Sequence, residues 1–68
     1  MMLIRPPFEV QQRAWEAAHV LRADFADRLL IEDRVRIEEV YLVGPEALGW
    51  ADVKTMLRCA RLTIGERS

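Results

Sequence analysis

The stretch IEDRVRIEEVYLVG, residues 31–44, decides the fold class of this chain, because it fits both a strand and a helix. Four β-forming residues share one parity within it: Val35, Ile37, Tyr41 and Val43. This alternation favours a strand, although Glu39 interrupts the apolar face. If a strand forms at about 34–43, its expected partners are MLIR near the start of the chain and LTIG near its end. The protein would then be α+β.

Helical features of the same stretch compete with the strand. The apolar residues with helical spacing are Ile37, Val40 and Tyr41. Two pairs of opposite charge stand four residues apart, Glu32 with Arg36 and Arg34 with Glu38. Gly44 followed by Pro45 is a typical C-terminal stop of a helix. We therefore predict a helix at about 34–43 and keep the α+β alternative open.

Upstream, residues 7–30 are predicted to form one long amphipathic helix, whose first turn contains proline and Glu9. One apolar stripe recurs at spacings of three and four: Val10, Ala14, Ala17, Ala18, Leu21, Phe25 and Leu29. A second apolar row lies about a quarter to a third of a turn away: Phe8, Trp15, Ala26 and Leu30. A face this broad fits either a helix at the centre of its own bundle or a self-association seam around Trp15.

Downstream, residues 49–63 are predicted to form the last helix, which Gly65 is placed to end. Its apolar face carries Trp50, Val53, Met56, Leu57, Ala60 and Ile64. A basic row lies beside that face: Lys54, Arg58 and Arg61. Cys59 falls off the predicted core face. The three segments together predict a mainly α protein, a small bundle of two to three helices.

The chain has 68 residues, enough for a single small domain with a modest core. A single cysteine, Cys59, excludes an intramolecular disulfide, and no residues have the spacing of a zinc site. Hydrophobic residues make up 51% of the chain, more than so short a chain can bury. We therefore expect some apolar surface to meet another chain and homo-oligomerisation to complete the bundle.

Nucleic-acid binding is the alternative function. A helix-turn-helix protein would present Lys54, Arg58 and Arg61 to DNA, but a formal net charge of −1 disfavours general attraction to nucleic acid. The turn at 44–49 is longer than usual, the last helix lacks Asn and Gln, and Asp52 at its start would repel phosphate. The sequence therefore favours a solvated basic face over a DNA-binding one.

Enzymatic activity is not expected, because the polar residues of an active site are nearly absent. His19 and Cys59 are single residues of their kinds, the chain has no Asn, and its one Ser is Ser68. His19 falls on the polar side of the first helix, where exposure is expected. Asp33, Glu38 and Glu39 lack the loop spacing of a calcium or magnesium site, so we predict no cofactor and no small-molecule substrate.

The start of the sequence, MMLIRPPF, holds too short an apolar run for a signal-peptide core or a membrane span. A cytoplasmic protein without membrane contact is therefore the expectation.

Two segments resemble small phage tail assembly chaperones: PFEV followed by Trp15, at residues 7–15, and LGWADVKTMLR, at residues 48–58. The similarity covers under a third of the chain, and the stretch at residues 31–44 has no counterpart in that family. The resemblance implies a non-catalytic protein that binds other protein chains during phage assembly.

Sequence and resemblance together predict a protein-protein interaction protein: an adaptor, an inhibitor or an assembly chaperone. Its expected partner is another protein, a second copy of itself, or both. The predicted interface consists of Phe8, Trp15, Ala26 and Leu30. An apolar helical surface would dock into a partner's groove there, in the helix-in-groove mode.

Overall fold

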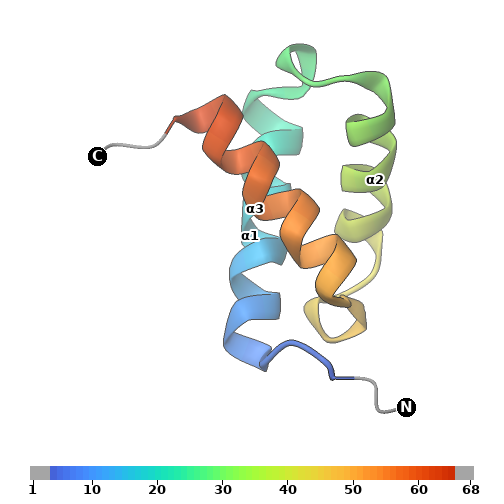
Figure 1. The fold of residues 1–68 in the computed structure, drawn as a ribbon. Helices are drawn as coiled ribbons and strands as arrows, with labels where there is room; N and C mark the ends of the chain where they lie inside the picture. The colour runs from blue at the N-terminus through green and yellow to red at the C-terminus, as the bar shows by residue number, and fades with distance from the viewer. Residues whose placement is uncertain (1–3, 66–68) are drawn as a thin grey trace.

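The computed structural model of the protein describes residues 4–65, and within them it contains three α-helices and no strand (Figure 1). The helices are α1 (Phe8–Asp24), α2 (Ile31–Leu42) and α3 (Trp50–Ile64). Two short 3-10 helices lie in the connections, η1 (Ala26–Arg28) and η2 (Pro45–Ala47). The prediction of a mainly α bundle is confirmed, and the α+β alternative with a strand at 34–43 is wrong.

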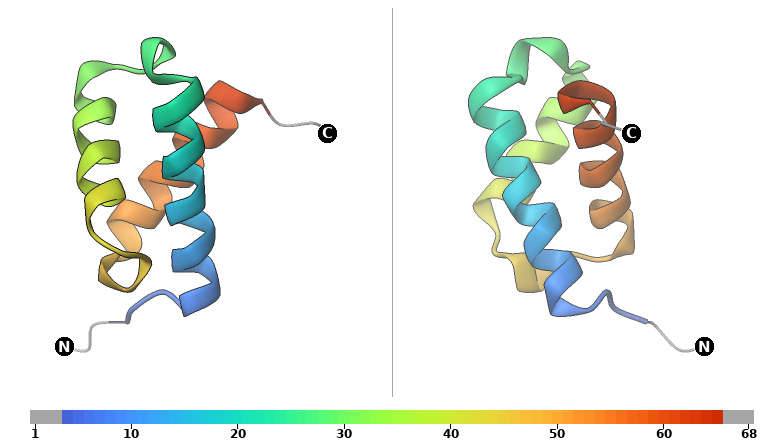
Figure 2. Two further views of the ribbon diagram at one scale, coloured as in Figure 1. Left: turned by 180° about the vertical axis from the view of Figure 1, so that it is seen from behind. Right: turned by 90° about the vertical axis from the view of Figure 1, so that its left-hand side faces the viewer.

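The three helices pack as a compact bundle in which α1 is central. α1 and α2 run side by side in opposite directions, joined at one end by η1, and α3 crosses both of them (Figures 1 and 2). α1 packs most extensively on α3 and next on α2, whereas α2 and α3 contact each other less. One side of α2 therefore lies away from the rest of the bundle.

The core lies where the three helices meet. Its buried apolar residues are Ala14, Ala18 and Leu21 from α1, Ile37 and Val40 from α2, Leu48, and Val53, Met56 and Cys59 from α3. The small side chains of Ala14 and Ala18, one turn apart on α1, let the neighbouring helices approach closely. Burying each large aliphatic side chain of this set contributes roughly 1.5–3 kcal/mol.

The first helix is shorter than predicted: α1 ends at Asp24 rather than at residue 30. Phe25 leaves the helical conformation with φ −130° and ψ 17°, and Leu29 and Leu30 are extended. Phe25 and Leu29 nevertheless pack against the core. The apolar spacing of the predicted long helix thus continues through a turn. The turn reverses the chain, so that α2 runs back along α1. α2 begins at Ile31, three residues earlier than predicted.

The connection between α2 and α3 is fixed against the start of α1. Gln11 Nε2 donates to the carbonyl oxygen of Leu48 at 2.8 Å and lies 3.3 Å from that of Glu46. Arg5 also donates to the Glu46 carbonyl, and Leu48 is fully buried. The Gly44-Pro45 stop therefore leads into a connection and a helix that pack on α1.

The last helix has nearly the predicted bounds, and the prediction that Gly65 ends it is confirmed by a φ of 97° at that glycine. Cys59, predicted to lie off the core face, is instead buried among the core residues. Trp50 and Ile64, predicted on the apolar face, lie at the two ends of α3 and are exposed. Close packing of α1 across the middle of α3 explains both differences, because it buries the centre of the helix rather than its whole length.

Candidate protein-binding surface

Helix α2 carries apolar side chains on two opposite faces. Ile37 and Val40 point into the core and are buried. On the outer face, Ile31 and Leu42 are each 76% exposed and Val35 is 54% exposed. Spacings of four and seven residues place these three side chains on one stripe, and 200° of helical rotation separates Val35 from Ile37. The outer stripe is therefore a second apolar face that no part of residues 4–65 covers.

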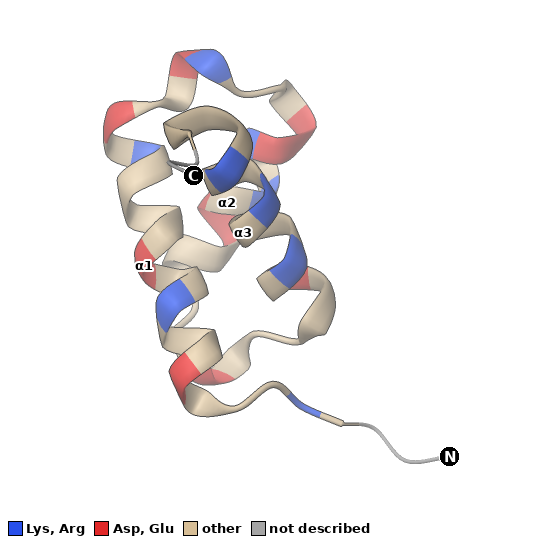
Figure 3. Cartoon of the chain, turned by 60° about the vertical axis from the view of Figure 1, so that its left-hand side comes forward, with Lys and Arg blue, Asp and Glu red and all other residues tan. Residues whose placement is uncertain are grey.

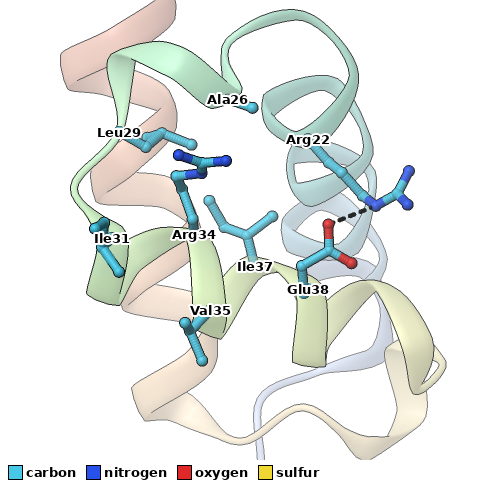
Figure 4. Close-up of a pocket in the computed structure, with 8 residues that line it drawn as sticks. All are labelled: Arg22, Ala26, Leu29, Ile31, Arg34, Val35, Ile37 and Glu38. Atoms are coloured by element: carbon cyan, nitrogen blue, oxygen red, sulfur yellow. Dashed lines mark hydrogen bonds and ion pairs between the residues drawn. The ribbon is translucent and has the colours of Figure 1, made fainter.

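An apolar hollow adjoins this stripe (Figure 4). Its volume is about 390 Å³, and it lies between the end of α1, η1 and the first half of α2. Its lining residues are Arg22, Ala26, Leu29, Ile31, Arg34, Val35, Ile37 and Glu38. The hollow exists because the chain leaves α1 at Phe25 and passes through η1 before α2 begins. We call the outer stripe of α2 and this hollow together the α2 surface.

The charged groups of the α2 surface differ in how they are paired. Arg22 Nε lies 2.8 Å from Glu38 Oε2, and the Arg22 guanidinium also lies over the Tyr41 ring, 4.1 Å from its centroid. Arg34 forms no ion pair within residues 4–65. Figure 4 shows its side chain extending across the hollow toward Leu29. A carboxylate of a bound molecule could therefore pair with Arg34 without breaking an existing ion pair.

A second, smaller hollow of about 190 Å³ extends the apolar surface at the same end of the molecule, and Leu29 lines both. Its lining residues are Arg28, Leu29, Leu30, Asp33, Arg58, Cys59, Leu62 and Thr63. Leu30 and Leu62 are largely exposed there. The end of the bundle that carries η1 thus has two neighbouring hollows with exposed apolar side chains at their edges.

The interface residues predicted from the sequence are placed in different parts of the molecule. Ala26 lines the first hollow and Leu30 the second. Phe8 is exposed at the opposite end of α1, a helix of 17 residues, or about 25 Å. Trp15 is half-buried and packs against the core of its own chain. The structure therefore brings Ala26 and Leu30 to neighbouring hollows and leaves Phe8 and Trp15 elsewhere.

Trp15 belongs to a cluster of rings that joins α1 to α2, in which neighbouring rings are steeply inclined to each other. The ring centroids of Trp15 and His19 are 4.2 Å apart, and those of His19 and Tyr41 are 4.8 Å apart. His19, expected to be exposed, is half-buried in this cluster. Trp15 Nε1 and His19 Nε2 are shielded from solvent and have no hydrogen-bond partner within residues 4–65. The rings therefore hold the two helices together through packing rather than hydrogen bonding.

The basic row on α3 forms a separate surface, which is visible as a run of Lys and Arg along that helix in Figure 3. Lys54, Arg58 and Arg61 line a shallow depression together with Thr55 and Leu57. Arg58 Nη2 lies 3.5 Å from Asp33 Oδ1 of α2. Asp52, in the first turn of α3, accepts a hydrogen bond of 2.7 Å from Arg36. Acidic groups of α2 and α3 thus adjoin the basic row.

Cys59 and His19 lie in different surroundings, Cys59 in the core and His19 between two aromatic rings. Burial raises the pKa of the Cys59 thiol, and the negative charge of Asp33 raises it further. A thiol with a raised pKa is a poor nucleophile at neutral pH, while the His19 ring packs against those of Trp15 and Tyr41. No group of three or more His, Cys, Asp or Glu side chains in residues 4–65 is arranged to hold a metal ion.

Comparisons with protein-family models, curated proteins and solved structures found no significant match to this chain. The resemblance of residues 7–15 and 48–58 to phage tail assembly chaperones therefore stays a prediction. Within the described part of the chain, no helix has the length and apolarity needed to cross a membrane.

The sequence prediction missed Ile31, Val35 and Leu42 as surface residues. Ile31 lies outside every predicted element, and Val35 lies within the predicted helix at about 34–43 and is also one of the β-forming residues of that stretch. The signal was nevertheless present, because apolar residues at positions 31, 35 and 42 have helical spacing and lie opposite Ile37 and Val40. A helix that is apolar on opposite faces needs two partners, and its own bundle supplies one.

Proposed function

We propose that this protein acts without catalysis, by binding another protein chain through the α2 surface. The observation that carries the proposal is the outer stripe of α2, where Ile31, Val35 and Leu42 are exposed on a helix whose opposite face is already in the core. Exposed apolar side chains gathered on one helix face beside a hollow are typical of protein-binding sites, whereas scattered single exposed apolar residues are not.

The expected mode of binding is a helix packed against α2, with apolar side chains in the neighbouring hollow. Each aliphatic side chain moved from water into such a contact contributes up to about 1.5–3 kcal/mol before the costs of association are subtracted. Arg34, whose side chain extends across the hollow, supplies a charge that selects a partner with a carboxylate at the matching position. An amphipathic helix with an acidic residue beside its apolar stripe has this chemistry.

A protein of this kind would serve as an adaptor, an inhibitor or an assembly chaperone, and would work by covering or scaffolding its partner. The resemblance to phage tail assembly chaperones is compatible with the last of these roles. A cytoplasmic location stays a prediction.

Photo-crosslinking in the native cells tests the proposal. A photoreactive amino acid at Val35 should give covalent adducts with a protein chain, because that side chain lies in the centre of the outer stripe. The matched control places the same group at Glu9, an exposed position in the first turn of α1. Adducts at neither position, or equally at both, would count against a binding site on α2.

A second candidate function is contact with DNA through the basic row, favoured by the gathering of Lys54, Arg58 and Arg61 along one side of α3. Binding of this kind would weaken steeply with added salt and with Lys54→Ala. A mixed-sequence duplex that shows no mobility shift at low salt excludes it. We rank it second, because Arg58 already lies beside Asp33 and because the formal net charge is −1.

A further inference from the structure

We infer that the chain that covers the α2 surface is a second copy of this protein, packed with its α2 antiparallel to the first about a twofold axis. The inference rests on the proposed function and deepens it, since it names the partner of the same surface. Three features of α2 support it: the order of its apolar residues, the arrangement of its charges, and the position of the hollow.

The outer stripe of α2 places large aliphatic side chains at both of its ends. In an antiparallel pair centred on this helix, Ile31 of one copy lies level with Leu42 of the other. Both side chains are 76% exposed in the single chain, so both are available for this contact. Near the axis, Val35 lies level with Glu38 of the second copy. The twofold operation repeats each contact, as an isologous interface requires.

The hollow lies beside Ile31, the residue that antiparallel packing places level with Leu42 of the second copy. Ile31 and Val35 line its edge, and Leu29 lies across from them on the other side of the hollow (Figure 4). Leu42 of the second copy, level with Ile31, would therefore enter the hollow and contact Leu29. By symmetry, Leu42 of the first copy enters the equivalent hollow of the second. The exposed leucine at the C-terminal end of α2 and the apolar hollow beside its N-terminal end thus fit each other.

The charges of α2 select the antiparallel direction. Antiparallel packing places Arg34, which has no ion pair within residues 4–65, level with Glu38 and Glu39 of the second copy. Arg22 already holds Glu38 at the edge of the hollow, at 2.8 Å, so this carboxylate is positioned for a second arginine. Parallel packing about a twofold axis would instead bring the two copies of Glu38 together near the middle of the contact, where their carboxylates repel each other.

The size of the surface predicts a reversible dimer. α2 has 12 residues, so the helical contact is about 18 Å long, and Ala26, Leu29 and Leu30 extend it on one side. Such an interface falls near the lower limit of about 1,000–1,200 Å² for specific complexes. The mass in solution should therefore depend on concentration.

Light scattering with sedimentation tests the dimer. The mass of the unmodified chain should rise from 7.9 kDa toward twice that value as the concentration increases. Val35→Glu and Leu42→Glu should each raise the concentration needed for dimerisation by about tenfold or more. Phe8→Glu, an exposed apolar position at the far end of α1, is the matched control and should leave it unchanged. Circular dichroism checks that each variant keeps its helices.

Disulfide trapping tests the direction of packing. In a Cys59→Ala background, a mixture of Ile31→Cys and Leu42→Cys chains should form a disulfide-linked dimer on mild oxidation. Leu42→Cys alone should not, because antiparallel packing separates the two copies of residue 42 by about 16 Å along the helices. Efficient linkage of Leu42→Cys to itself would show parallel packing and overturn the inference.

The outcomes separate this inference from the proposed function. A chain that stays at 7.9 kDa at every concentration overturns the dimer. If Val35 then forms photo-crosslinks to a heavier protein, the binding surface stands and its occupant is a different chain. If Val35 forms no crosslinks either, both proposals fail.

Discussion

Gln11 of α1 donates a hydrogen bond of 2.8 Å through Nε2 to the carbonyl oxygen of Leu48, 37 residues along the chain. Among residues 4–65, Gln11 is the one buried polar side chain, with 5% of its surface exposed. The bond fixes the connection that leads into α3, because it satisfies a backbone carbonyl that the fold removes from water. This contact between distant segments sets where α3 begins relative to α1.

Replacing Gln11 by alanine should lower the free energy of unfolding by about 1–3 kcal/mol, because the buried carbonyl of Leu48 would lose its donor. Urea denaturation followed by circular dichroism measures the change. Gln12→Ala is the control: its Nε2 bonds to Glu16 at 2.9 Å on the exposed side of α1, so its effect should stay within about 0.5 kcal/mol. Equal losses for the two variants would contradict a structural role for the buried bond.

Leu21→Ala should cost about 2–5 kcal/mol in the free energy of unfolding, because Leu21 is fully buried where the helices meet and its truncation leaves a cavity. Leu42→Ala removes the same atoms from an exposed site, so its cost should stay within about 0.5 kcal/mol. The comparison is made at low concentration, because dimerisation would add to apparent stability. A large loss at Leu42 in the monomer would show that this leucine packs within its own chain.

Trp15→Ala should reduce the free energy of unfolding by about 2–3 kcal/mol, somewhat less than the loss at a fully buried tryptophan, because Trp15 is half-buried against His19 and the core. Helicity at moderate urea should fall in parallel. Preserved stability together with lost self-association would instead support the seam around Trp15 that the sequence predicted.

The stability of the folded chain should fall at alkaline pH through Cys59. Burial raises the pKa of its thiol in the folded state, with Asp33 adding to the effect, so the folded thiol holds its proton more tightly than the unfolded one. This contribution is fully present below the unfolded thiol pKa of about 8.5 and is lost as pH rises through the higher folded pKa. Urea denaturation at neutral and alkaline pH, compared between the native chain and Cys59→Ala, isolates it. Equal pH dependence in both chains would mean that the thiol titrates alike in the two states.

The candidate surface was only partly predictable. The sequence indicated surplus apolar residues and a helical binding surface, but it placed the interface on a long first helix. Ala26 and Leu30 of that prediction do border the hollows, although neither belongs to α1. The sequence does not assign Ile31 and Val35 to a helix face, because a short segment with apolar residues at many positions fits both the period of a strand and that of a helix.

The sequence by itself determined that the first and last segments are helical and that a glycine ends α3, since periodicity and capping act over a few residues. It favoured a helix between them but left a strand open, and the structure decided for the helix. Only the tertiary structure decided that α1 stops at Asp24, because residues 24–30 contain no glycine or proline and their apolar spacing continues a helix. Packing of Phe25 and Leu29 on the core outweighs that local preference and turns the chain. The turn creates the hollow and leaves the outer face of α2 uncovered. Which apolar residues remain exposed therefore depends on contacts between distant segments, which a local pattern does not contain.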